Sequence, residues 1–377
     1  MSLGKEERDA VIRVMNRGIL SNYQGNWSDA FYGGEEVKAL EKEWAEYFGV
    51  KHAIVCNSAT SGLWLACAAI GLQNNFETID KKSRGTWSQP DYYKPDEVIV
   101  SPYSMTCSAS IPLHFGAKPV FADIEKDYYC LDPESVERAI TEHTKAIIVV
   151  DLFGQPADYD EINRIASEYG QRYGHKIYVI EDSAQSIGAK YKGKYAGTLG
   201  DIGVFSLNRH KHIQCGEGGM VVTDNDELAM KIRLAMNHSE AVMNSMPSES
   251  IHDVFSNVKA FSDARKLIGL NLRMTELQAA IAREQLKKLE GILQTVREYA
   301  KYFPVKVRKE CESAFYRYAW EHKDKIPNID SRLFNVKRHY ITPLFKLPLF
   351  KHLGYDQEQC KTCQDIENNI VLAWIKE

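Results

Sequence analysis

The chain of 377 residues is 44% hydrophobic, so it is long and apolar enough for a large core and for about two to three domain-sized units. Its 51 acidic and 47 basic residues leave a formal net charge of −4 and are spread along the chain, which argues against a nucleic-acid or membrane-surface partner. No run approaches the roughly 20 apolar residues of a membrane span, and the N-terminus has no secretory apolar core, so we expect a cytoplasmic protein.

Short apolar runs alternate with amphipathic helical patterns between residues 35 and 290. The predicted strands are "HAIVCN", "EVIVS", "PVFADI", "KAIIVVD", "KIYVIED", "VFSLN" and "MVVTD". Apolar strands separated by helices are typical of a mostly parallel sheet covered on both faces. We therefore predict an α/β protein with a large domain over residues 1–290 and a smaller C-terminal α+β domain over residues 291–377.

A long helix is predicted near the end of the large domain, in "TELQAAIAREQLKKLEG". A capping box of Thr275 with Gln278 opens it, and Gly291 is expected to end it. Two long polar stretches, residues 72–96 and 237–266, interrupt the alternation of strands and helices. They either line a site or decorate the surface.

The cysteines predict no metal centre. All eight are scattered, and Cys360 with Cys363 forms a single CxxC without a second CxxC or a histidine pair. We interpret these two as free cysteines near the start of a helix.

The motif "CNSATSGL" places small hydroxyl residues where a strand gives way to a helix. The free N–H groups at a helix start bind anions, and Ser58, Thr60 and Ser61 add hydroxyl donors, so a phosphate is a natural guest. Ordinary helix capping by these residues is the alternative.

The motif "VIEDSAQSIGA" ends an apolar strand on Glu181 and Asp182. A carboxylate in this buried position needs a cation or a hydrogen-bond donor. For Asp182 that partner is either Lys211, in a structural ion pair, or the protonated ring nitrogen of a cofactor.

Lys211 lies in "FSLNRHKHIQCGEGG", between two apolar strands and beside Arg209, His210 and His212. Partial desolvation near other cations lowers the pKa of a lysine and frees its amine for Schiff-base formation. A phosphate anchor, a carboxylate and a lysine at three strand ends of one sheet are the groups that pyridoxal 5′-phosphate (PLP) requires.

The motifs "NSATSGL", "GAKPVFADI", "IEDSAQSIGA", "FSLNRHKHIQCGEGG" and "GLNLRMTELQAA" occur in this order and resemble the DegT-type (DegT/StrS) nucleotide-sugar aminotransferases, a branch of the fold-type-I PLP enzymes. The resemblance implies an aspartate-aminotransferase-like fold. It implies that Lys211 binds the cofactor as a Schiff base, that Asp182 keeps the pyridine nitrogen protonated and that Gln185 lies near the ring's 3-oxygen. The phosphate ligands it implies are Ala59, Thr60 and Ser206.

Three further assignments follow from the same resemblance. Met105 corresponds to the residue that stacks on the cofactor ring, with Tyr103 as the alternative if the register slips by two. Asn271 corresponds to a residue that reaches the phosphate of the neighbouring subunit, which implies a homodimer with shared active sites; the alternative for Asn271 is a helix cap. His339 and Tyr340 fall near a motif of the sugar site.

The resemblance implies an aminotransferase that takes the amino group of L-glutamate and gives it to a ketone of a nucleotide-activated sugar, in surface polysaccharide or related biosynthesis. A sugar dehydratase of the same fold is the alternative, but in that branch a histidine replaces the lysine found here. Amination of a non-nucleotide keto-sugar or cyclitol, and a non-catalytic PLP-fold protein, remain open.

Overall fold

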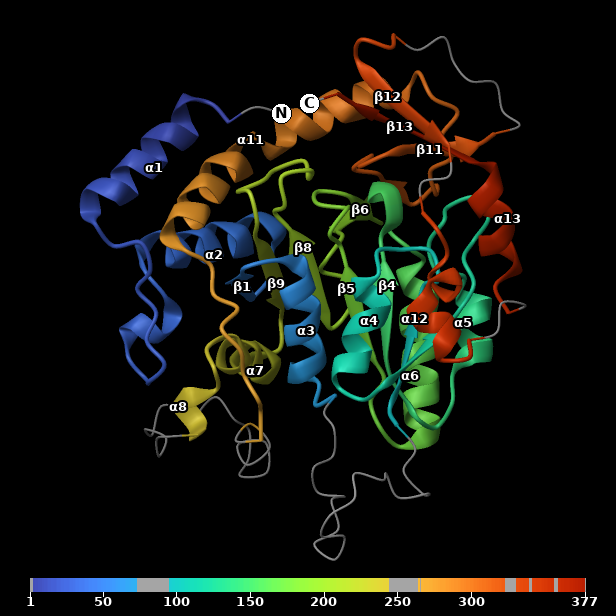
Figure 1. Ribbon diagram of the computed structural model, residues 1–377, viewed down its shortest axis with the longest axis horizontal. Helices are drawn as coiled ribbons and strands as arrows, with labels where there is room; N and C mark the ends of the chain where they lie inside the picture. The colour runs from blue at the N-terminus through green and yellow to red at the C-terminus, as the bar shows by residue number, and fades with distance from the viewer. Residues whose placement is uncertain are drawn as a thin grey trace, which may run out of the picture.

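The computed structural model describes residues 3–72, 95–243, 264, 266–322, 330–338, 341–355 and 359–376. A seven-stranded sheet in the order β1-β9-β8-β5-β4-β2-β3 forms its centre (Figure 1). The strands are β1 (His52–Cys56), β2 (Glu97–Val100), β3 (Lys118–Phe121), β4 (Thr144–Val150), β5 (Tyr178–Asp182), β8 (Ile202–Ser206) and β9 (Gly219–Thr223). Strand β9 runs antiparallel to both neighbours and the other pairs are parallel, so the predicted α/β fold with a mostly parallel sheet is confirmed.

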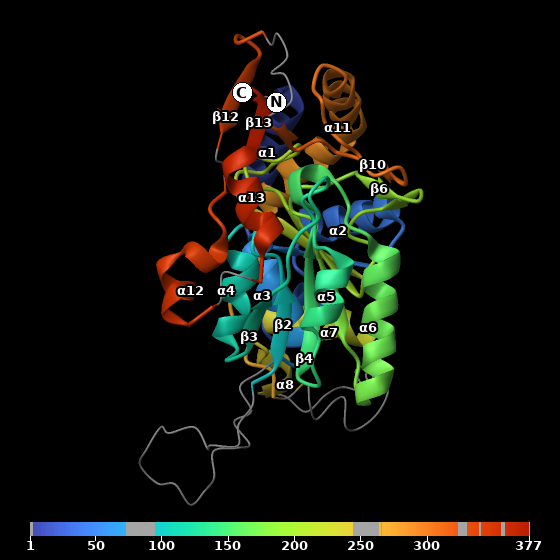
Figure 2. The same ribbon diagram turned by 90° about the vertical axis from the view of Figure 1, so that its right-hand side faces the viewer.

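Helices cover both faces of this sheet. They are α2 (Glu35–Phe48), α3 (Ala59–Ala69), α4 (Cys107–His114), α5 (Pro133–Ala139), α6 (Tyr159–Tyr173) and α7 (Asp226–Met236). Figure 2 shows α3 and α4 on one side of the strands and α5 and α6 on the other. Successive side chains of a strand point to opposite faces of the sheet. In β1, Ile54 therefore packs in the same cluster as α3, whereas Ala53 and Val55 pack with α2. Both faces are buried, which explains the near-continuous apolar strands.

Helix α11 (Glu276–Ala300) lies beside α1 (Lys5–Arg17) and α2 (Figure 1). The predicted capping box of Thr275 with Gln278 is present. The predicted stop at Gly291 is wrong, because the buried apolar face of the helix continues through Leu293 and Val296. A Cβ added at Gly291 would meet no atom of the described residues within 4 Å apart from its chain neighbours and the adjacent helix backbone, so no steric demand of the described part requires a glycine there.

A second sheet lies in the C-terminal region, in the order β11-β13-β12, with β11 (Tyr318–Glu321), β12 (Phe334–Arg338) and β13 (Ile370–Ile375). It has its own apolar cluster, which includes Phe303, Tyr318 and Trp320. The predicted domain boundary at residue 290 falls inside the continuous helix α11. The boundary therefore stays a prediction.

Other C-terminal elements pack against the large core. They are α12 (Pro348–His352) and α13 (Lys361–Asn369), whose residues Phe350 and Cys363 belong to the same cluster as the central sheet. Cys360 and Cys363 are buried thiols at the start of α13 that form no disulfide, as predicted. No group of three or more metal-ligating side chains occurs in the described ranges.

Most of the two long polar stretches, residues 73–94 and 244–263, lies outside the described residues, so their role stays a prediction. Within the ranges given above, no helix is both long and apolar enough to cross a membrane.

Candidate active site

Three strand ends bring the predicted motifs to one edge of the sheet. Strands β1, β8 and β5 run in the same direction and end at Cys56, Ser206 and Asp182. The carboxyl ends of parallel strands share one edge, where ligands of such sheets bind. The helix start, the carboxylate and the lysine turn therefore belong to the same part of the molecule.

Asp182 ends β5 with a side chain that is only 5% exposed. Its Oδ2 accepts a hydrogen bond from Ser108 Oγ at 3.0 Å, and its Oδ1 accepts one from the Ala184 N–H at 3.3 Å. Burial raises the pKa of this carboxyl, while both donors and the charge of Lys211 oppose that rise. The contacts of the carboxylate are therefore to Ser108 and Ala184 rather than to Lys211, which leaves it suited to a further cationic partner.

Lys211 lies in the turn between β8 and β9 and is partly exposed. Its Nζ is 4.5 Å from the centroid of the Tyr316 ring. The pKa of Lys211 is lowered to about 8, mainly by desolvation; the Asp182 charge opposes this shift and the Arg317 charge contributes to it. A pKa this low supplies free amine near neutral pH, which is what a Schiff-base lysine needs.

The next residue, His212, anchors this turn. Its ring is buried, and Nε2 lies 2.8 Å from the Ala314 carbonyl oxygen. Burial lowers the pKa of His212 to about 4, so the ring is neutral at physiological pH and acts as a hydrogen-bond donor to that carbonyl.

The start of α3 carries the predicted phosphate ligands Ala59 and Thr60. Ser58 is the N-cap and accepts a hydrogen bond from the Ser61 N–H at 3.1 Å, so the capping alternative describes Ser58 correctly. A Cβ on Gly219 would lie 2.6 Å from the Ser58 carbonyl carbon, so β9 begins in van der Waals contact with this helix start. This close contact explains on steric grounds why position 219 of the Gly-Glu-Gly-Gly turn is a glycine.

Ser206 ends β8 and is buried, and its Oγ accepts a hydrogen bond from the Asn208 N–H at 3.3 Å. Its hydroxyl hydrogen is not used by that bond, so the group can donate to an anion. The roles of Ala59, Thr60 and Ser206 as phosphate ligands stay predictions.

The start of α4 supplies two site residues that the sequence analysis missed. Ser108 donates a hydrogen bond to Asp182. The Cys107 thiol is hydrogen-bonded to the side chain of Thr60, and the nearby charges of Asp182 and Lys211 shift its pKa in opposite directions. Burial raises the pKa of Cys107 to about 12, so it is a neutral thiol. The available signal was the polar run "SPYSMTCSAS" directly after a predicted strand.

Gln185 is held by its amide oxygen, which accepts a hydrogen bond from the Phe153 N–H at 2.9 Å. The Gln185 amide nitrogen is therefore the end that can donate to a ligand. Its predicted place near the cofactor's 3-oxygen is compatible with this orientation and stays a prediction.

Of the two residues considered for ring stacking, only Met105 is accessible. The Met105 side chain is 69% exposed, whereas Tyr103 is completely buried in the main core. A buried ring cannot cover a ligand, so Met105 remains the predicted stacking residue.

Asn271 is exposed, and its Oδ1 accepts a hydrogen bond from Arg273 Nε at 2.9 Å. The cap of α11 is Thr275, so the alternative role of Asn271 as a helix cap is wrong. The exposed Asn271 amide does not cap α11 and is therefore compatible with the predicted contact to the phosphate of the neighbouring subunit. His339 and Tyr340 lie outside the described residues.

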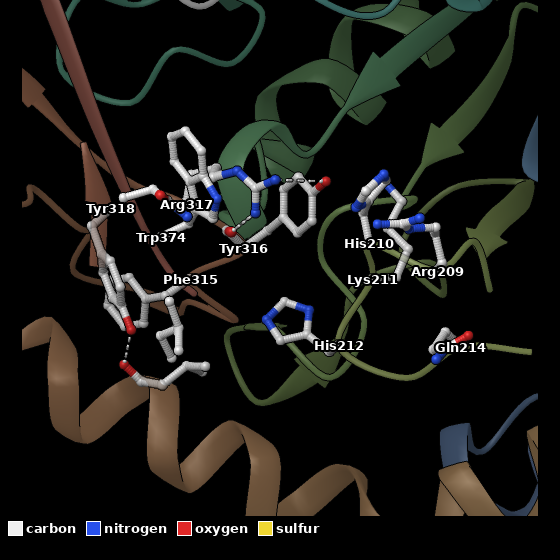
Figure 3. A pocket seen from close by; sticks show the side chains of 13 residues that line it. Arg209, His210, Lys211, His212, Gln214, Phe315, Tyr316, Arg317, Tyr318 and Trp374 are labelled. Carbon is white, nitrogen blue, oxygen red and sulfur yellow. Dashed lines mark hydrogen bonds between the residues drawn. The ribbon is translucent and has the colours of Figure 1, made fainter. Parts of the chain in front are cut away.

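A cavity of about 760 Å³ adjoins Lys211 (Figure 3). Its lining comes from the lysine turn and from the C-terminal sheet and includes Arg209, His210, Tyr316, Arg317 and Trp374. Among the described lining residues none is acidic, so the cavity favours an anionic ligand.

Arg317 is held in a fixed orientation within this cavity. Its Nη1 donates to the Tyr316 carbonyl oxygen at 2.8 Å and its Nη2 to the Tyr316 hydroxyl at 3.2 Å. The guanidinium carbon lies 4.0 Å from the centroid of the Tyr316 ring and 5.1 Å from that of Trp374. Figure 3 shows Tyr316 between Arg317 and Lys211, so the two cations are one aromatic ring apart. Neither Tyr316 nor Arg317 was predicted from the sequence as a site residue.

The chemistry of these donors fits PLP. A helix start with hydroxyl groups suits the phosphate, a buried carboxylate with two neutral donors suits a protonated pyridine nitrogen, and a lysine of lowered pKa suits the aldehyde. Gly219 allows the strand and helix start that flank the phosphate position to approach closely.

Comparison with known proteins agrees with this fit. Residues 23–373 match the family described as the DegT/DnrJ/EryC1/StrS aminotransferase family. An uncharacterized protein of Methanocaldococcus jannaschii is 36% identical over 371 residues, which cover 94% of this chain and 84% of the relative. GDP-perosamine synthase of Caulobacter vibrioides is 34% identical over 288 residues, which cover 76% of this chain and 63% of the relative.

Solved structures share the fold over nearly the whole chain. GDP-4-keto-6-deoxymannose-3-dehydratase with a trapped PLP-glutamate geminal diamine superposes with a TM-score of 0.75 at 25% sequence identity. The superposition covers 99% of this chain and 94% of that chain.

Proposed function

Because the chain belongs to the DegT/DnrJ/EryC1/StrS aminotransferase family and is a PLP-dependent aminotransferase, we propose that it moves the amino group of L-glutamate to a ketone of a nucleotide-linked sugar. The product would enter a surface polysaccharide or a related sugar. The name of the C. vibrioides relative supports a nucleotide-linked acceptor, and the glutamate trapped in the dehydratase structure supports the donor.

The observation that carries this proposal is the position of Lys211. Its partly desolvated amine opens on a cationic cavity and lies one aromatic ring from Arg317. An amino acid bound with its nitrogen at the lysine position would have its acid groups within the reach of this arginine. A planar guanidinium held at two nitrogens is suited to a carboxylate.

The side chains have separate tasks in this proposal. Bound PLP supplies the electron sink that makes the Cα–H bond of an amino acid acidic. An ionised Asp182 would keep the pyridine nitrogen of bound PLP protonated, while Ser108 fixes the carboxylate by its hydrogen bond. The Lys211 amine would hold the cofactor and, as a free amine, would move the proton of the substrate carbon.

One cavity must accept two substrates in turn. Its volume of about 760 Å³ is in the range of pockets for ligands much larger than an amino acid. The cations that bind the donor carboxylates can also bind a diphosphate, since both are oxyanions. The open, polar character of the lining therefore suits alternate binding of glutamate and of a nucleotide sugar.

We also propose a cytoplasmic homodimer in which each site is completed by the partner. The exposure of Asn271, which caps no helix, supports this arrangement. A site shared across a two-fold interface needs both subunits for activity.

Dehydration of a keto-sugar is the second candidate, because one of the solved structures that share this fold is a dehydratase. Lys211 disfavours it, since the dehydratase branch has histidine at that position. No contact in the described part of the chain favours dehydration over amination.

The proposal is tested by absorption spectroscopy of the PLP-loaded protein. Addition of L-glutamate should remove the visible band of the lysine-bound cofactor and release 2-oxoglutarate in an equal amount. A nucleotide-linked keto-sugar should then restore the band and leave as an amino sugar, detected by mass spectrometry. A band that is indifferent to glutamate, or a product that has lost water and gained no nitrogen, would refute amination.

A further inference from the structure

Asp151 is a completely buried carboxylate that follows β4, and all of its hydrogen bonds are internal. Oδ1 accepts from the Tyr159 hydroxyl at 2.8 Å and from the Ala157 N–H at 3.2 Å. Oδ2 accepts from Ser186 Oγ at 2.8 Å and from Ser183 Oγ at 3.0 Å. Oδ1 is thus bound to the start of the α6 region, whereas the partners of Oδ2 within the described ranges are the two serines.

Both serines belong to the segment of residues 182–186, here called the cofactor loop. Ser183 directly follows Asp182, and Ser186 directly follows Gln185. Each serine is therefore next to a residue that is predicted to touch the cofactor ring. Fixing the two serines fixes the backbone from which both ligands project.

Backbone contacts strengthen the same connection. The Asp151 N–H donates to the Asp182 carbonyl oxygen at 3.2 Å, and the Phe153 N–H donates to Gln185 Oε1 at 2.9 Å. Phe153 has a φ of 60°, a left-handed conformation that is unfavourable for a phenylalanine. The turn of residues 151–154 is thus held in a strained shape against the cofactor loop.

The other side of this turn faces the segment that carries Tyr316 and Arg317. The Gly154 carbonyl oxygen accepts from the Ala314 N–H at 2.8 Å. A Cβ on Gly154 would lie 2.7 Å from the Tyr316 backbone nitrogen, so only glycine allows this approach. The turn is therefore packed between the cofactor loop and the wall of the cavity.

A carboxylate at position 151 is costly. Burial raises the pKa of Asp151 to about 6, and its charge contributes to raising the pKa of the buried Glu181. An uncharged side chain of similar size would fill the space without this repulsion. The negative charge is needed because two serine hydroxyls donate to the same oxygen, Oδ2, and a neutral amide oxygen would be a weaker acceptor for both.

We infer that Asp151 is a positioning residue for PLP, which uses its Oδ2 to hold Ser183 and Ser186 and thereby sets Asp182 and Gln185 against the cofactor ring. Asp151 does not touch the cofactor. It acts through the cofactor loop, as an outer residue that orients the ligands.

The test compares Asp151→Asn with the wild type in cofactor binding. The substitution keeps the size of the side chain and removes its charge. In one orientation of the new amide, its NH₂ group would face the two serine hydroxyls that donate to Oδ2 in the wild type. We expect about tenfold weaker PLP affinity, as is usual for loss of an orienting partner, measured by fluorescence titration of the apo protein. The visible band of the lysine-bound cofactor should also shift in position or in its pH titration, because the Asp182 carboxylate no longer sits at its place.

Two further experiments separate positioning from folding. The double variant Ser183→Ala/Ser186→Ala removes the same two hydrogen bonds without altering position 151, so it should reproduce the affinity loss even if Asp151→Asn does not fold. Asp123→Asn is the matched control, since Asp123 is also a buried carboxylate but binds the N–H groups of Thr362 and Cys363 at the start of α13. It should lower the melting temperature and leave PLP affinity and the visible band unchanged.

The inference is wrong if Asp151→Asn and the double serine variant bind PLP with wild-type affinity and an unchanged band. It is equally wrong if the control variant alters affinity and band as much as Asp151→Asn does. These measurements use no amino donor and no sugar, so their outcome does not depend on the proposed substrates.

Discussion

The lowered pKa of Lys211 leads to a sharp prediction about how the apo protein captures PLP. With a pKa of about 8, roughly one lysine in eleven is free amine at pH 7, against about one in 2,500 for an ordinary lysine. The rate of PLP capture at fixed PLP concentration should therefore rise with pH and level off above about pH 8 rather than above pH 10. Stopped-flow absorbance at a series of pH values measures this directly.

Two substitutions should move the midpoint in opposite directions. The positive charge of Arg317 lowers the pKa of Lys211, so Arg317→Gln should raise it; a rise of one unit would reduce the free amine at pH 7 about tenfold. The negative charge of Asp182 raises the pKa of Lys211, so Asp182→Asn should lower it. Arg332→Gln is the control, because Arg332 is an exposed arginine paired with Asp330 on the surface. It should leave the midpoint unchanged.

The prediction fails if the wild-type midpoint lies near pH 10, or if Arg317→Gln moves it down. A midpoint near 8 that neither substitution shifts would show that desolvation alone sets the pKa. In that case the charges of Arg317 and Asp182 would have no part in tuning Lys211.

Three other predictions concern the same site. Lys211→Ala should keep the fold, seen by circular dichroism, but bind PLP without the lysine-bound visible band and without turnover; retained turnover would remove Lys211 from the mechanism. Ser108→Ala removes one donor from a buried carboxylate, at a cost of about 1–3 kcal/mol, so PLP should bind about 5- to 150-fold more weakly in a fluorescence titration. Mixing inactive Lys211→Ala with inactive Asn271→Ala should restore about a quarter of wild-type activity after subunit exchange, because half of the dimers then hold one intact site; no recovery would contradict a shared site.

The sheet and the three motifs could be predicted from the sequence because both depend on local patterns. Apolar runs of strand length predict the strands, and the rule that parallel strands end at one edge places Asp182, Ser206 and the start of α3 together. The same local reasoning failed at Gly291, where the signal for a helix end was overridden by the continuing apolar face of α11.

The cavity wall could not be predicted, because it depends on contacts between distant parts of the chain. Tyr316 and Arg317 lie more than a hundred residues after Lys211 and carry no motif that marks them. Ser108 precedes Asp182 by 74 positions, and only the packing of α4 against the sheet brings them together. Long-range packing of this kind leaves no periodic signal in one sequence.

The sequence also could not separate the roles of three acids, Asp151, Glu181 and Asp182, which the structure places at the ends of the neighbouring strands β4 and β5. Glu181 and Asp182 are consecutive in one strand, so their side chains point to opposite faces. Glu181 accepts the N–H groups of Gly197, Leu199 and Gly200, which bind it into the turn before β8 and leave it no access to the cavity. Among the described residues, Asp182 has two donors, Ser108 and Ala184, whereas Asp151 has four. Since a cofactor cation needs a carboxylate with lone pairs to spare, this count of donors favours Asp182 as the predicted partner of the cofactor nitrogen over Asp151 and Glu181.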